Sequence, residues 1–239
     1  EWRAAAASFR ENSARFRLQD GSFPINGNTV FANPLKSSRV DYAHAVGLTG
    51  AGEVIAVVDE GFRRTHEVFA GKASTTTGSP LVDDHGTTVA SIAAGNSGTM
   101  VGVAPGADLV FSSWDSEDLA AAANEATRRG AVAQNNSWGF PGYYATLANY
   151  NSLIADPDAA AWLTALDNYA ANGVVVFATS NTTAATQGEL LEALPLFRPS
   201  LLSGWIAVGN SIPVFDDAGV SAVGRRVSAP CLAAAQWCM

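Results

Sequence analysis

The sequence is poor in the residues that most often build metal and redox sites. Its 239 residues include two cysteines, two methionines and three histidines. The histidines, His44, His66 and His85, lie far from both cysteines. A zinc-protease helix places two histidines four residues apart, but the residue four positions after His66 is Ala70. The sequence therefore predicts no catalytic transition metal.

Long apolar runs are also missing. The longest, EVIAVV at 53–58 and GVVVFA at 173–178, are far shorter than the roughly 20 residues of a membrane-spanning helix. Residues 1–24 lack the cationic start, apolar middle and small-residue cleavage site of a secretory signal. We therefore expect no membrane span in this chain, and we expect an exported form to have lost its signal already.

Positive charge is scarce beyond the first 50 residues. The chain has 14 Lys and Arg against 22 Asp and Glu, for a formal net charge of −8, and residues 1–50 hold six of those cations. So acidic a body argues against nucleic acid as a partner. No predicted strand is followed by the phosphate-binding patterns G-x-G-x-x-G or G-x4-G-K-[ST], which disfavours a nucleotide-binding domain.

The two cysteines, Cys231 and Cys238, lie close together near the C-terminal end of the sequence. Their spacing allows a small disulfide loop, which is typical of proteins in an oxidising compartment. Two free thiols would be equally ordinary in an intracellular protein. We expect the disulfide.

What the sequence does have is enough apolar residues, 48%, to fill a sizeable core. We interpret residues 1–39 as an N-terminal extension, with a helix over 3–18 and turn residues over 20–29, and residues 40–239 as the main domain. In that domain a helix follows His85, and the tail after residue 210 is expected to be irregular. Further helices are predicted at 116–130 and 157–173, and strands at 53–61, 107–114, 131–139, 174–181 and 204–210.

Near-continuous apolar strands that alternate with helices indicate an α/β fold with a mainly parallel central sheet and helices on both faces. In such sheets, the functional groups gather at the carboxyl ends of the strands. Asp59, Trp138 and Asn181 lie at those ends on this interpretation.

Three residues are candidates for chemistry, and each has a structural alternative. Asp59 can be a buried strand-end carboxylate held by backbone amides, or it can pair with a cation. His85 lies in the first turn of a helix rich in small residues, which holds it in place as either a structural group or a base. Asn181 can form an Asx turn, accept a glycan at N-T-T, or direct its amide at an anion.

Five segments in order resemble the subtilisin-like serine peptidases, or subtilases. They cover the chain from about residue 40 to 230, and the gap between the last two segments is most similar to that of subtilases on bacterial autotransporters. The segments are GLTGAGEVIAVVDEG (47–61), DDHGTTVASIAAG (83–95), GVAPGADL (102–109), NNSWG (135–139) and GVVVFATSN (173–181).

The resemblance implies roles for particular residues. Asp59 and His85 correspond to the family's triad aspartate and histidine, and Asn181 to its oxyanion asparagine. Ser137, Trp138 and Gly139 correspond to the strand that binds extended peptide, with residues 112–116 opposite. Calcium is often bound by this family, but no set of ligands can be matched here, and no cofactor is assigned.

The sequence also departs from the family pattern. Glu60 follows the triad aspartate, Ser180 replaces a glycine before the oxyanion asparagine, and Cys231 replaces a glycine after the family's Ala-Pro. Above all, the G-T-S motif that carries the nucleophilic serine is absent from these 239 residues. We therefore expect this domain to be incomplete and inactive by itself, with the serine in a separate polypeptide derived from the same protease.

Two functions follow from the resemblance. The first is a secreted, periplasmic or cell-surface serine endopeptidase that cleaves peptides or proteins through an Asp-His-Ser triad. The alternative is a catalytically inactive subtilase-fold module that binds a peptide or a protein partner. A serine-bearing remainder of the same protease is the partner expected by the first function and not by the second.

Overall fold

A six-stranded parallel sheet forms the centre of the molecule. The structure, a computed structural model, describes residues 1–25, 28–32, 34–114, 118–216 and 219–239. The order of the strands is β4-β5-β3-β6-β7-β8, and every pair within it is parallel. This confirms the predicted sheet. Its strands are β3 (Val54–Asp59), β4 (Ser74–Thr77), β5 (Asp108–Ser113), β6 (Ala133–Asn136), β7 (Val174–Ala178) and β8 (Trp205–Val208).

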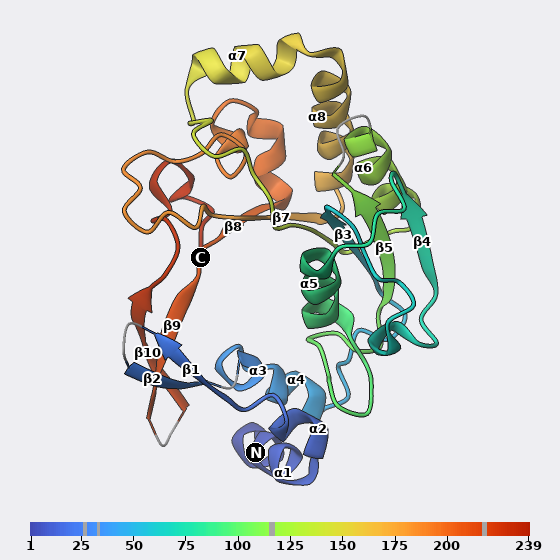
Figure 1. The fold of residues 1–239 in the computed structure, drawn as a ribbon, viewed down its shortest axis with the longest axis vertical. Coiled ribbons are helices and arrows are strands. Elements are labelled where there is room, and N and C mark those ends of the chain that lie inside the picture. The colour runs from blue at the N-terminus through green and yellow to red at the C-terminus, as the bar shows by residue number, and fades with distance from the viewer. Residues whose placement is uncertain (26–27, 33, 115–117, 217–218) are drawn as a thin grey trace.

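Helices cover both faces of this sheet, as predicted (Figure 1). Helix α5 (Asp84–Ala94) packs on one face, while α6 (Leu119–Arg128) and α8 (Pro157–Ala170) pack on the other. Side chains alternate between the faces along a strand, so Val57 joins the α5 core while Ala56 joins the core of α6 and α8.

Helix α8 anchors the second core. It begins as the sequence predicts, because the side chain of Asp156 accepts hydrogen bonds from Asp158 N and Ala159 N at 2.8 and 3.1 Å. Its residues Trp162 and Leu166 are almost completely buried. Each such side chain contributes about 1.5–3 kcal/mol to folding.

The N-terminal region differs from the prediction. The expected single helix is divided into α1 (Trp2–Asn12) and α2 (Ala14–Arg17), because Ser13 is extended and its hydroxyl caps the second helix. The expected turn region contains two antiparallel strands, β1 (Gly21–Ile25) and β2 (Asn28–Ala32). Two short helices follow, α3 (Pro34–Ser37) and α4 (Val40–Ala45), and an ion pair between Arg10 and Asp41 joins α1 to α4.

The tail is also more regular than predicted. Strands β9 (Ser211–Asp216) and β10 (Gly219–Arg226) form an antiparallel pair where we expected irregular chain. Helix α7 (Leu147–Ala155), which has no buried residues, was not predicted. Short 3-10 helices span Glu67–Phe69, Leu194–Leu196, Pro199–Gly204 and Leu232–Ala234. In the described part of the chain, no helix has the length and apolar character needed to cross a membrane.

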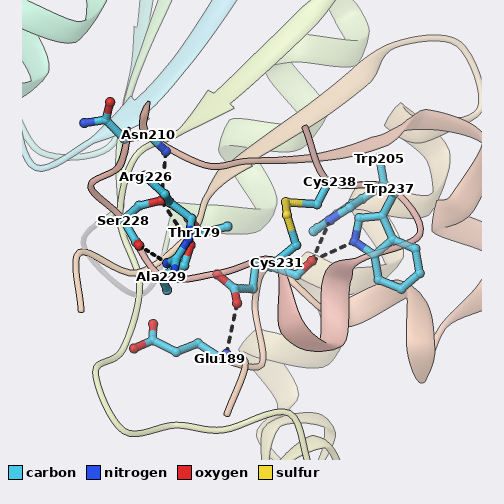
Figure 2. Close-up of a disulfide and its surroundings, with 11 residues drawn as sticks. Thr179, Glu189, Trp205, Asn210, Arg226, Ser228, Ala229, Cys231, Trp237 and Cys238 are labelled. Atoms are coloured by element: carbon cyan, nitrogen blue, oxygen red, sulfur yellow. Dashed lines mark hydrogen bonds between the residues drawn. A yellow bond between two sulfur atoms is a disulfide. The ribbon is translucent and has the colours of Figure 1, made fainter. Parts of the chain in front are cut away.

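A disulfide joins Cys231 and Cys238 in the final segment (Figure 2). Beside it, the indole N–H groups of Trp205 and Trp237 both donate to the main-chain carbonyl of Glu192, at 3.3 and 2.9 Å. Met239 N in turn donates to the carbonyl of Ala207. These contacts hold the C-terminal segment against β8 and the loop that contains Glu192.

Candidate active site

Asp59 and His85 meet at the carboxyl end of the sheet. Asp59 is the last residue of β3 and only 2% exposed, and it faces α5 because it is two residues after Val57. His85 lies in the first turn of α5. Its Nδ1 atom is 2.8 Å from Oδ1 and 3.0 Å from Oδ2 of Asp59.

The contact depends on a close approach of α5 to the loop after β3. A Cβ atom added to Gly86 would lie 2.3 Å from the carbonyl oxygen of Gly61 and 2.9 Å from Cβ of Asp59. A Cβ atom on Gly61 would lie 2.5 Å from the carbonyl oxygen of Leu81. Two glycines therefore allow the helix and the loop to bring the carboxylate and the imidazole together.

Asp83 fixes the start of the helix. Its Oδ1 atom accepts hydrogen bonds from His85 N at 2.7 Å and from Gly86 N at 3.3 Å. A carboxylate at this end also favours the helix dipole. Asp83 therefore orients the turn that carries His85, while Asp59 receives the imidazole itself.

The surroundings of the pair define what it can do. Burial raises the pKa of the Asp59 carboxyl, against the lowering effect of hydrogen bonds from His85 and from Glu60 N. The His85 side chain is 59% exposed, and no described residue hydrogen-bonds its Nε2. When Nδ1–H donates to the carboxylate, Nε2 carries the lone pair. The arrangement suits a positioned general base.

Asn181 lies beyond the end of β7. It is exposed, and its side-chain amide makes no hydrogen bond to a described residue. The preceding residue is anchored, because Ala229 N donates to the Ser180 carbonyl at 2.6 Å. No direct contact joins Asn181 to Asp59 or His85, but β3, β6 and β7 are neighbours and end at the same edge of the sheet.

The segment after β6 contributes an aromatic surface at this edge. Asn135 Nδ2 donates to Ser137 Oγ at 2.9 Å, and Gly139 is exposed. The Trp138 ring stacks on Trp114, with centroids 6.1 Å apart, and its buried Nε1 has no hydrogen-bond partner among the described residues. Of the opposite segment, 112–116, positions 115 and 116 lie outside the described residues.

One group of three potential metal ligands is present in the described ranges: Asp59, Asp83 and His85, whose ligand atoms lie within 4.8 Å of one another. Nδ1 of His85 is already bonded to Asp59, and Oδ1 of Asp83 caps the helix. Calcium takes six to eight oxygen ligands. The group therefore does not fit calcium, and no step below involves a metal.

Comparison with known proteins identifies the family of this chain. The sequence model of the subtilase family matches residues 50–235, most of the chain. The chain belongs to the subtilase family. The family predicted from the sequence is therefore confirmed.

Solved structures agree on the fold. The patellamide maturation protease PatG matches with a TM-score of 0.54 at 16% identity, over 74% of this chain and 63% of that one. The patellamide maturation protease PatA gives 0.51 at 22%, over 70% and 58%. The prenylagaramide maturation protease PagA gives 0.50 at 23%, over 66% and 53%. This subtilase therefore spans about half to two thirds of the length of these relatives. No curated protein matches it.

The sequence did not lead us to expect a pair of neighbouring acidic residues, Glu189 and Glu192, in the segment between β7 and β8 of this subtilase. Glu192 is 2% exposed, and its Oε1 atom accepts from Glu189 N at 3.2 Å. The pKa of Glu192 is raised to about 7, mainly by burial and also by the charge of Glu189, against the lowering effect of backbone N–H groups of Glu189 and Ser180. The signal in the sequence was GELLEALP (188–195), in which two acids interrupt a buried apolar run.

Proposed function

We propose that this chain supplies the acid–base pair and the peptide-binding surface of a serine endopeptidase. The observation that carries the proposal is the contact between Nδ1 of His85 and both carboxylate oxygens of Asp59, at 2.8 and 3.0 Å. A buried acid behind a half-exposed imidazole leaves Nε2 accessible to a nucleophile from the solvent side.

In this proposal, Nε2 of His85 removes the proton from a serine hydroxyl as its oxygen attacks the scissile carbonyl carbon. The resulting imidazolium is stabilised by Asp59. It returns the proton to the leaving amine as the C–N bond breaks, and the acyl-enzyme is then hydrolysed by water, which the same base activates. None of the described serines hydrogen-bonds to Nε2, and we expect the nucleophile outside these 239 residues.

Asn181 and the segment 137–139 complete the proposed site. The free amide of Asn181 would donate to the oxyanion of the tetrahedral intermediate. Backbone groups of Ser137, Trp138 and Gly139 would pair with an extended peptide. One structural relative, the PatG macrocyclase, has been solved in complex with peptide, which supports peptides as substrates here. The disulfide supports a secreted, periplasmic or cell-surface location.

A second function is a binding module without turnover. The observation in its favour is the lack of a G-T-S motif in the sequence, while the cleft segment 137–139 and Asn181 are accessible. Such a module would bind peptide without cleaving it.

Labelling with a fluorophosphonate separates these functions. The full-length gene product is treated with the probe, digested and mapped by mass spectrometry. We expect label on a serine outside residues 1–239, and loss of that label in His85→Ala. A label on a serine within residues 1–239 would contradict the assigned roles, and a protein that binds peptide but takes no label would support the binding module.

A further inference from the structure

We propose that Glu189 makes this site selective for substrates with a cationic side chain, arginine or lysine, directly before the scissile bond. The inference rests on the proposed function, because it assigns a preference to the same cleft. Its origin is an unbalanced negative charge on the wall of that cleft.

Glu189 borders the peptide-binding segment. A Cβ atom on Gly139 would lie 3.4 Å from the Oε2 atom of Glu189, which is van der Waals contact, so the carboxylate lies directly beside this segment. The backbone of Glu189 is fixed by a bridge to Tyr144, with Leu190 N donating to the Tyr143 carbonyl at 2.8 Å. The carboxylate is therefore held at the wall of the cleft and half-buried.

A cavity of about 270 Å³ adjoins this carboxylate. It is lined by Glu189, by Ser180, and by residues of the loops 141–144 and 182–187. Ser180 directly precedes the proposed oxyanion donor Asn181. A side chain that enters the cavity would thus belong to the residue whose carbonyl the site attacks.

A second carboxyl group lies behind the first. Glu192 is 2% exposed, and no Lys, Arg or His among the described residues forms an ion pair with Glu189 or Glu192. Its Oε2 atom is buried without a hydrogen bond of normal geometry. A buried polar atom without a partner costs free energy. Glu189 lines the cavity and has no cationic partner among the described residues, so a positively charged side chain in the cavity would find a carboxylate with which to pair.

Glu189 is the member of the pair that a ligand can reach. In Figure 2 its side chain extends away from the disulfide and the two tryptophans. Glu189 lines the cavity, whereas Glu192 is buried behind it. Arginine and lysine carry their charge on a long stem, and a guanidinium can donate two parallel hydrogen bonds to one carboxylate.

The test compares peptides that differ only in the residue before the scissile bond: arginine, lysine, norleucine and glutamate. The kcat/KM of the full-length gene product is measured for each, in the wild type, in Glu189→Gln and in the control Glu53→Gln. Glu53 is exposed just before β3, at the opposite end of the sheet, and its substitution makes the same change in charge.

We expect the wild type and Glu53→Gln to prefer arginine or lysine over norleucine by about 10- to 100-fold. Glu189→Gln should lose most of that preference, mainly through a lower kcat/KM for the arginine and lysine peptides. A wild type that cleaves norleucine as well as arginine overturns the inference even if the variant does not fold, as does a preference that survives in Glu189→Gln. Cleavage of none of the peptides would instead contradict the proposed function.

Discussion

Two buried carboxylates flank the cleft, and they differ in what faces them. Asp59 and Glu192 are both 2% exposed, and burial raises the pKa of each. Asp59 meets the imidazole of His85, whereas Glu192 meets a backbone N–H and the acid Glu189. The cost of desolvation is therefore offset by an imidazole at Asp59 and only in part by backbone N–H groups at Glu192. The neighbouring groups, and not the degree of burial, therefore decide whether such an acid can orient a base, as Asp59 does, or is available to attract a cation.

The largest effect should come from breaking the first partnership. Asp59→Asn keeps the shape of the side chain but no longer accepts Nδ1–H through a charged oxygen, so His85 loses its tautomer. The loss of kcat in the full-length protein should be about 10⁴-fold, the size the equivalent change has in a serine protease. Asp84→Asn, an exposed acid next to His85 in the sequence, should change kcat little. Equal losses of kcat in Asp59→Asn and Asp84→Asn would contradict a specific role for Asp59 as the partner of His85.

A smaller effect is expected from Gly86→Ala. The new Cβ atom would clash with the Gly61 carbonyl and press on Asp59. We expect a loss of about 3 kcal/mol in the free energy of unfolding, measured in urea, and a lower kcat. Gly98→Ala is the matched control, because nothing lies within 4 Å of that Cβ position. If both glycines tolerate alanine equally, the close approach is not what brings the pair together.

The buried carboxyl group of Glu192 should make the free energy of unfolding depend on pH. Burial raises the pKa of Glu192 to about 7 in the folded state, above about 4.3 in the unfolded chain. The folded protein therefore holds this proton more tightly. Its contribution to stability is complete below about pH 4 and is lost as the pH rises through about 7, amounting to no more than about 4 kcal/mol.

Urea unfolding of wild type and Glu192→Gln at several pH values measures this contribution. At low pH, Glu192→Gln should be less stable than the wild type. As the pH rises, the wild type loses stability but the variant, which cannot ionise at this position, does not. The variant should therefore become the more stable of the two. Glu53→Gln should follow the wild-type curve. If the stabilities of wild type and Glu192→Gln changed with pH in parallel, the folded protein would not raise the pKa of Glu192.

The smallest effect concerns the two helix caps. Asp83→Ala and Asp156→Ala each remove an N-cap whose oxygen accepts two backbone N–H groups. Each should lower the free energy of unfolding by about 1 kcal/mol. Only Asp83→Ala should also lower kcat, because α5 carries His85 and α8 carries no residue of the site. A loss of activity in both variants would indicate that global stability, and not orientation, connects the cap to the site.

Most of the central sheet could be predicted from the sequence because β3, β5, β7 and β8 are largely apolar runs. Strand β4, with the sequence Ser-Thr-Thr-Thr, could not be predicted in this way, since it lies at the edge of the sheet and is partly exposed. Helix α7 buries none of its residues, so no apolar face marks it. The pairs β1–β2 and β9–β10 depend on antiparallel pairing that local composition did not reveal.

Part of the site could also be predicted from the sequence, and part could not. Asp59 and His85 were predicted as a pair because each stands in a segment that resembles the family, and the structure places them in contact. Their carry-over roles, and that of Asn181, stay predictions. Glu189 and Glu192 were missed because two acids spaced by three residues look like one face of a surface helix. Their environment is created by Gly139 and by the C-terminal tryptophans, which are distant in the sequence.

The role of Asp59 in holding His85 as a base can be tested through the protonation of the two ring nitrogens of His85. NMR of the full-length protein with ¹⁵N-labelled histidine, at about pH 8 where an ordinary imidazole is neutral, reports which nitrogen carries the proton. We predict that His85 carries it on Nδ1, with Nε2 unprotonated, and that Asp59→Asn abolishes this preference. A proton on Nε2 in the wild type, or a tautomer unchanged by Asp59→Asn, would contradict the account.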